Sequence, residues 1–210
     1  MTRDDIKRNV LSKIDEISPF QETDQQFDSL MESMLDDCAN RYLTVIPIHL
    51  IISKELQLSV NPPVNFERGV ANYHDLGVVL LPDEFLRLAY VNCFEWRKPV
   101  NASEVLTCST PEYGRQFNFH TKAGLQKPMV FIDSESTKHK RLIISPFRDQ
   151  WEIKNLKIYY VPKTKSEDMQ ENLLDGFYWF FAGLLLDAMQ RYEQGKMAMG
   201  KFGEFLVNKQ

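Results

Sequence analysis

The stretch GVVLLPDEFLRLAYVNCFEWRKPV, residues 77–100, decides the fold that we expect for the middle of this chain. Residues 78–81 form a short apolar run, which is typical of a buried strand, and Pro82 with Asp83 then predicts a turn. Residues 86–97 follow a period of two, which predicts a second strand. Its two sides would carry, respectively, Leu86, Leu88, Tyr90, Asn92, Phe94 and Trp96, and Arg87, Ala89, Val91, Cys93, Glu95 and Arg97.

This strand, turn and strand order resembles a motif of the head-to-tail connector (ring adaptor) proteins of tailed bacteriophages, most closely those of crAss-like podoviruses. In that motif an LPxDFxRL-type turn leads into a strand that carries a tryptophan. The matching residues are Leu81, Pro82, Asp83, Phe85, Arg87, Leu88 and Trp96, with Glu84 next to the acidic position. We predict a structural role for Pro82, Phe85, Arg87 and Trp96, with Phe85 and Trp96 buried and Arg87 forming charge-assisted hydrogen bonds near the turn.

The resemblance implies a structural virion protein of the phage neck. It would assemble in the host bacterial cytoplasm as a closed homo-oligomeric ring below the portal, usually a dodecamer. Such a ring extends the DNA channel, attaches tail components and helps to retain the packaged genome. Its partners would be the portal protein and other ring or tail proteins, while DNA passes through the lumen without sequence-specific binding. No membrane partner is expected.

The composition is that of a soluble globular protein, since 43% of the 210 residues are hydrophobic and 26% are charged. The formal net charge of −4 argues against a protein that wraps nucleic acid, which needs a basic surface. The spacing of Cys38, Cys93 and Cys108 matches no zinc or redox motif, so buried thiols in a reducing cytoplasm are expected. The first residues, MTRDDIKRNV, carry alternating charges and no apolar core, so no signal peptide is expected there, and the apolar run 176–186 is too short to span a membrane.

Helices are expected at both ends of the chain. Ile6, Val10, Ile14 and Ile17 predict an amphipathic helix with Thr2 as its N-cap, ending at Ser18 and Pro19. A second helix would start at Thr23, with Gln26 completing a capping box, and would run to about Val45. A third would run from Ser166 to about Tyr192, with apolar residues over most of its circumference. Its own domain or neighbouring subunits would cover it, and Gly176 with Gly183 would admit another backbone.

The region between these helices is predicted to be β-rich. Residues 128–132 and 141–145 predict a hairpin, and residues 151–161 predict a last strand or pair of strands with a possible break at Asn155. Phe117 and Phe119 predict a short strand, and Ser103 or Thr110 could cap a one-turn helix, the latter with Pro111 in its first position. The expected fold class is therefore α+β, with N-terminal helices in 1–56, a β-rich region in 57–165 and a C-terminal helix in 166–192 completing the helical body.

The last segment, 193–210, is predicted to be an extended docking tail. Gly195, Gly200 and Gly203 loosen its backbone, but its side chains are too apolar for a solvated tail. The residues expected to dock on a neighbouring subunit or on the portal are Met197, Met199, Phe202, Phe205, Leu206 and Val207. The alternative is a tail folded back on its own domain.

No catalytic constellation, metal site or cofactor motif is recognisable in the sequence, so we do not expect an enzyme. If an active site formed only in three dimensions, its candidates would be His74, Asp75 and His120. A small binding or regulatory module of unknown partner is the other alternative. The most basic run is Lys138, His139, Lys140 and Arg141, with Arg148 nearby, and it is interpreted as a solvated loop that could contact nucleic acid or an acidic partner.

Overall fold

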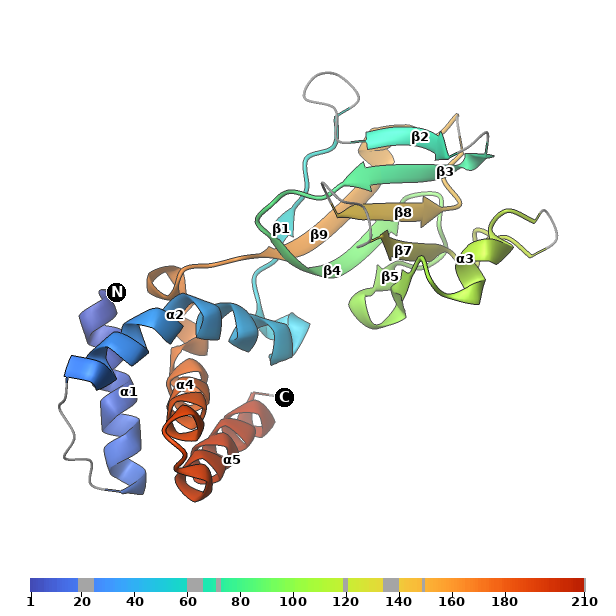
Figure 1. Ribbon diagram of the computed structural model, residues 1–210. Coiled ribbons are helices and arrows are strands. Elements are labelled where there is room, and N and C mark those ends of the chain that lie inside the picture. Colours follow the sequence, from blue (N-terminus) through green and yellow to red (C-terminus); the bar gives the residue numbers. More distant parts are fainter. Residues whose placement is uncertain are drawn as a thin grey trace. The chain divides into compact units, whose positions relative to one another are not determined.

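The fold divides into two compact units (Figure 1). The structure is a computed structural model that describes residues 1–18, 25–59, 66–70, 73–118, 121–133, 140–148 and 150–209. One unit combines the two chain ends, Met1–Ile52 and Lys163–Gln210, and contains the long helices. The other unit, Ser53–Pro162, contains the strands. The predicted α+β class, with helices at both ends, is confirmed.

The helical unit is built from four helices: α1 (Arg3–Ile17), α2 (Gln25–Val45), α4 (Leu174–Ala188) and α5 (Tyr192–Asn208). The predicted N-cap of α1 is confirmed, because the Thr2 side chain accepts from the backbone N–H of Asp5 while the Asp5 carboxylate accepts from the backbone N–H of Thr2. The capping box predicted for Thr23 and Gln26 lies outside the described residues. The buried face of α1 carries Ile6, Val10 and Ile14.

Helix α4 is the core of this unit, and it contacts α1, α2 and α5 (Figure 1). From α2, the Tyr42 hydroxyl donates a hydrogen bond of 2.8 Å to the Leu173 carbonyl just before α4. The Tyr42 ring lies 5.6 Å, between centroids, from Phe177 and Phe180 of α4, and 5.7 Å from Phe202 of α5. The apolar circumference of α4 is therefore covered by helices of its own chain, without a neighbouring subunit.

The prediction of one helix from Ser166 to Tyr192 is wrong at both ends. Two 3₁₀ turns, η4 (Ser166–Asp168) and η5 (Glu171–Leu173), precede α4. At the other end, Gln190 adopts φ 63°. The N–H of Arg191 then bonds to the carbonyl of Leu186, and the N–H of Gln190 to that of Asp187, at 2.9 Å each. This hydrogen-bond pattern is a Schellman motif, and it ends α4 so that the chain can turn into α5.

The prediction of an extended tail is also wrong, because residues 192–208 form α5 and pack on α4. An added Cβ at Gly176 would overlap the Phe205 ring and lie 2.6 Å from the Tyr42 hydroxyl. One at Gly183 would lie 2.7 Å from the Met199 sulfur. The two glycines predicted to admit another backbone therefore receive α5. Burial of apolar side chains at helical spacing outweighs the helix penalty of the tail glycines.

The β unit consists of two hydrogen-bonded sheets, with strand orders β1-β9-β4-β5 and β2-β3-β8-β7-β6. All pairs are antiparallel except β6 with β7. Side chains from both sheets form one apolar core. The strands are β1 (Lys54–Glu55), β2 (Phe66–Val70), β3 (Tyr73–Leu80), β4 (Phe85–Cys93), β5 (Val100–Asn101), β6 (Leu106–Thr107), β7 (Met129–Asp133), β8 (Arg141–Ser145) and β9 (Leu156–Pro162).

Strand β4 ends at Cys93, four residues before the predicted end at Arg97, and its buried side chains do not follow one period of two. Its pairing with β9 is irregular in two places. A bulge adds a residue to one strand and so changes which face the following side chains occupy. The predicted alternation is met from Ala89 onward, where Ala89, Val91 and Cys93 of one predicted side are buried. It is wrong at the start of the strand, because Phe85 and Leu88 are buried as well and the alternation places Leu88 on the opposite side.

The remaining local predictions are largely met. Strands β7 and β8 form the predicted hairpin, and β9 starts directly after Asn155, at the expected break. Helix α3 (Pro111–Arg115) has Thr110 as N-cap and Pro111 in its first turn. The alternative cap, Ser103, lies inside the 3₁₀ turn η2 (Ala102–Glu104).

The predicted strand at Phe117 is wrong. The residue follows α3 in a turn and packs edge-on against Tyr113, with 5.2 Å between ring centroids, while Phe119 lies outside the described residues. Tyr113 in turn packs on Phe131 of β7, in a small second cluster with Val78 and Ile143. Tyr113 and Phe117 are four residues apart, about one helical turn, so their rings meet although α3 itself ends at Arg115.

The packing of α5 on α4 is tested by a matched pair of glycine substitutions. Gly176→Ala forces a methyl group into Phe205 and Tyr42, and we expect the free energy of unfolding to fall by about 1–3 kcal/mol. At Gly200 an added Cβ meets nothing within 4 Å, so Gly200→Ala should raise it by about 0.5–1 kcal/mol through helix propensity. Chemical denaturation measures both. Equal effects of the two substitutions would contradict the packing of α5 on α4.

Candidate functional site

The turn between β3 and β4 is attached to the β core through the buried Leu81 and Phe85 on either side of it. The N–H of Phe85 bonds to the Pro82 carbonyl at 2.9 Å, which closes the turn. The Phe85 ring is buried and stacks on Tyr160 of β9, with 5.9 Å between ring centroids. Glu84 accepts hydrogen bonds of 2.8 Å from the Tyr160 hydroxyl and from the Lys54 amine. The motif residues of this turn therefore join the start of β4 to β9 and β1.

Trp96 lies in the loop after β4 and anchors that loop to the core. It is 6% exposed, and its indole N–H donates a 3.0 Å hydrogen bond to the Pro146 carbonyl. Its backbone N–H donates to the Cys93 carbonyl at 2.9 Å. Because its side chain is held by both packing and a hydrogen bond, Trp96 attaches the loop after β4 to the core.

Residues 94–98, which we name the Phe94 loop, present a phenylalanine to solvent. The Phe94 side chain is 84% exposed, although its backbone N–H donates to the Asn155 carbonyl at 3.0 Å. The Glu95 carboxylate accepts from the Cys93 thiol and from the Asn155 side-chain amide, both at 2.8 Å. The N–H of Arg97 donates to the Leu125 carbonyl at 3.0 Å. The loop is thus held in place, with Trp96 buried and the Phe94 side chain in water.

An apolar cleft of about 370 Å³ opens at the start of β4. Arg87 is half-buried there, and burial lowers the pKa of its guanidinium. The Lys140 amine lies at the same cleft, 5.9 Å from the centroid of the Phe85 ring. The residues that line what we name the Arg87 cleft are Phe85, Leu86, Arg87, Leu88, Ala102, Val105, Leu106, Thr107, Ile132 and Lys140. Two cations among apolar walls make this cleft suited to an aromatic ring or an anion with an apolar body.

The six residues predicted to dock elsewhere are distributed around α5. Phe202 is buried, and Met199, Phe205 and Leu206 are half-buried. Met197 is 59% exposed and Val207 is 69% exposed. Within this subunit, therefore, Met197 and Val207 are the tail residues whose side chains remain mostly available to a partner.

Of the three candidates for a hidden active site, the structure describes the side chain of Asp75 alone. Its carboxylate contacts the Lys122 amine in an ion pair. The His74 side chain and His120 lie outside the described residues, as do Lys138 and His139 of the basic run. From that run, Lys140 lines the Arg87 cleft and Arg141 lies 3.9 Å from the Asp133 carboxylate.

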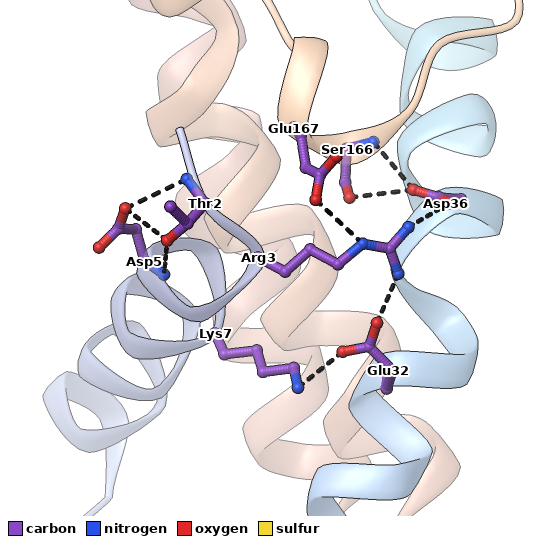
Figure 2. A network of polar contacts seen from close by, with 8 residues as sticks. All are labelled: Thr2, Arg3, Asp5, Lys7, Glu32, Asp36, Ser166 and Glu167. Carbon is purple, nitrogen blue, oxygen red and sulfur yellow. Dashed lines mark hydrogen bonds and ion pairs between the residues drawn. The ribbon is translucent and has the colours of Figure 1, made fainter.

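A charged network joins α1, α2 and η4 in the helical unit (Figure 2). The Arg3 guanidinium binds Glu32 and also reaches Asp36 at 2.8 Å and Glu167 at 3.2 Å. Glu32 also pairs with the Lys7 amine at 2.6 Å. We did not predict this network, although its signal is in the sequence: Arg3 and Lys7 are one turn apart on α1, and Glu32 and Asp36 one turn apart on α2.

The network lowers the pKa of its carboxyl groups. Hydrogen bonds from Lys7 and then Arg3 lower the pKa of Glu32. Burial acts to raise the pKa of Asp36, but hydrogen bonds from the backbone N–H and hydroxyl of Ser166, at 2.9 and 3.0 Å, together with Arg3, lower it. Asp36 thereby connects α2 to the chain segment that leads into α4.

Cys38 of α2 and Cys93 of β4 have the character of unreactive, structural thiols. Cys38 and Cys93 are buried, and burial raises the pKa of each thiol to about 12. Cys108 is half-buried. A thiol with so high a pKa is a poor nucleophile at neutral pH, so Cys38 and Cys93 contribute packing.

The described side chains contain no group of three or more histidine, cysteine, aspartate or glutamate residues that could hold a metal ion. Among the helices in the described ranges, none has both the length and the apolar character needed to cross a membrane. Comparison of the sequence with protein-family models and with curated proteins gives no match. The candidate site is accordingly defined by geometry, as the Phe94 loop and the Arg87 cleft at the two ends of β4.

Removing Trp96 tests its anchoring role. Trp96→Ala should lower the free energy of unfolding by about 3–5 kcal/mol, because a large buried side chain is lost. Trp96→Phe keeps part of the packing but leaves the Pro146 carbonyl without its donor, so a smaller loss is expected. Chemical denaturation followed by circular dichroism measures both. Wild-type stability of Trp96→Ala would show that the core does not depend on this side chain.

Removing Arg3 tests the charged network through pH. A carboxylate with a lowered pKa stabilises the fold above its ordinary pKa, which is 4.5 for Glu32 and 3.8 for Asp36, and this stabilisation is lost as the pH falls through the lowered value. Arg3→Ala should therefore lower the melting temperature at pH 7, by less in high salt, and the difference from wild type should shrink below about pH 4.

Arg8→Ala is the matched control, because Arg8 lies on the same helix with its side chain 80% exposed. It should change the melting temperature little at any pH. If the effect of Arg3→Ala were the same at pH 7 and at pH 3, the carboxylates would not be its cause.

Proposed function

We propose that this protein is a structural component of a bacteriophage neck, forming a ring below the portal that extends the DNA channel and attaches tail components. The observation that carries the proposal is the role of the motif residues. Phe85, Leu88 and Trp96 are all buried in one core, and the turn at Pro82 is closed by the hydrogen bond from the Phe85 N–H to the Pro82 carbonyl. The motif residues thus stabilise the core of the β unit, which is a role expected in a structural protein.

The organisation of the chain also supports an assembly protein. Both ends of the chain build one helical unit, and a complete β unit with its own core is inserted between them. Among the β-unit side chains that the structure describes, Phe94 is the most exposed large apolar one, and a hydrogen-bonded loop carries it. A side chain displayed in this way suits a contact with another protein.

The proposal includes the partners that the resemblance implies. Further copies of this chain would close a ring, a dodecamer in the proteins that it resembles, and the portal and other ring or tail proteins would bind to it. The net charge of −4 is compatible with a lumen that lets DNA pass without sequence-specific binding. The protein would have no catalytic activity of its own and would reside in the virion neck.

The mass and symmetry of the purified assembly test this proposal. We expect native mass spectrometry and electron microscopy to show a closed ring, alone or after addition of portal protein, because heterologous contacts close into rings when their rotation is an integral fraction of a circle. Portal alone is the control. A monodisperse monomer at high concentration, with and without portal, would contradict the ring.

A further inference from the structure

The Phe94 loop has the properties of a preformed binding element. Phe94 is 84% exposed, whereas the loop around it is fixed by the buried Trp96 and by backbone hydrogen bonds of Phe94, Trp96 and Arg97. A fixed loop loses little conformational entropy when a partner binds, so less of the apolar gain of burying the ring is offset by the cost of ordering the loop. Aromatic side chains that enter a pocket commonly dominate such contacts.

The Arg87 cleft matches this element in size and in electrostatics. A volume of about 370 Å³ exceeds that of a phenylalanine ring, and most of the lining residues are apolar. Arg87 and Lys140 supply cations at the cleft, and a cation within about 6 Å of an aromatic centroid is attracted to the negative face of the ring. Lys140 already lies 5.9 Å from the centroid of the Phe85 ring. A phenylalanine ring that entered the cleft would meet the same kind of cation.

The two features lie at opposite ends of one strand. Leu86, Arg87 and Leu88 of the cleft are at the start of β4, and Phe94 follows the end of β4 at Cys93. With about 3.3 Å per residue, the six steps from Leu88 and the eight from Leu86 place the backbone of Phe94 roughly 20 to 26 Å along the strand from the cleft. A subunit therefore cannot fill its own cleft with its own Phe94. The two surfaces are different, so a contact between them is heterologous and joins subunits head to tail.

We propose that Phe94 of one copy inserts into the Arg87 cleft of a second copy, with its ring against the guanidinium, and that this contact joins successive subunits. The inference rests on the proposed ring, for which it names the two contacting surfaces. It is also separable from that ring, because another pair of surfaces could close a ring and because this contact alone could form a chain of subunits.

Two single substitutions disable the two halves of the contact. Phe94→Ala removes the inserted ring, and because the side chain is exposed the melting temperature should not change. Ala102→Trp fills the cleft from its wall while leaving Phe94 intact. Each variant alone should be monomeric by native mass spectrometry under conditions in which the wild type assembles. Ile52→Ala is the control, because Ile52 is 77% exposed in the helical unit, and it should assemble as the wild type does.

Mixing the two variants gives the decisive result. Phe94→Ala keeps a working cleft and Ala102→Trp keeps a working Phe94, so an equimolar mixture should form a dimer with one copy of each and nothing larger. Photo-crosslinking repeats the test without altering the cleft: benzoylphenylalanine at position 94 of the full chain should crosslink between subunits to Leu86, Val105 or Ile132. This second readout decides the matter if Ala102→Trp fails to fold.

Each result separates the contact from the ring. Rings that persist in Phe94→Ala, or crosslinks that map outside the cleft, overturn the contact and leave the ring standing. Crosslinks to the cleft in chains that do not close support the contact and contradict the ring. A wild type that stays monomeric and yields no crosslink between subunits overturns both.

Discussion

The burial of α4 is the constraint on which the rest of the helical unit depends. A helix with apolar residues on nearly every side must be covered on nearly every side, and α1, α2 and α5 provide that cover from both ends of the chain. Tyr42 combines the two requirements of such a core, since its ring packs against aromatic rings of α4 and α5 while its hydroxyl is satisfied by the Leu173 carbonyl. Because this core joins the two ends of the chain, residues 53–162 are an insertion within the helical unit.

In the β unit, the buried Trp96 holds the loop from which the Phe94 side chain is exposed. Trp96 is buried and hydrogen-bonded, and two residues before it Phe94 is held in water by the same loop. At the start of the same strand, bulges in the β4–β9 pairing lie beside the half-buried Arg87 and its apolar cleft. A strand with an exposed aromatic ring after one end and a cationic cleft at the other offers the two different surfaces that the proposed contact between copies requires.

Local signals carried most of the secondary structure, and their failures have a common cause. Thr2 capping, the end of α2, the hairpin of β7 with β8 and the break at Asn155 all depend on residues close in sequence, and they were predictable. The tail was misread because Gly195, Gly200 and Gly203 were weighed by propensity alone. The cost of these glycines in helix propensity is outweighed by the contacts of α5 with α4. Those contacts depend on residues of α4, so the tail sequence alone does not reveal them.

By itself, the sequence determined the α+β class, the helices at both ends and the burial of Phe85 and Trp96. Only the tertiary structure decided which faces are buried, that α5 returns to α4, that Arg3 meets carboxylates on α2 and η4, and that Phe94 points away from the core that holds Trp96. The physical reason is the range of the interactions. Periodicity and capping act within a few residues, whereas bulges, aromatic packing and ion pairs are settled between segments far apart in the chain.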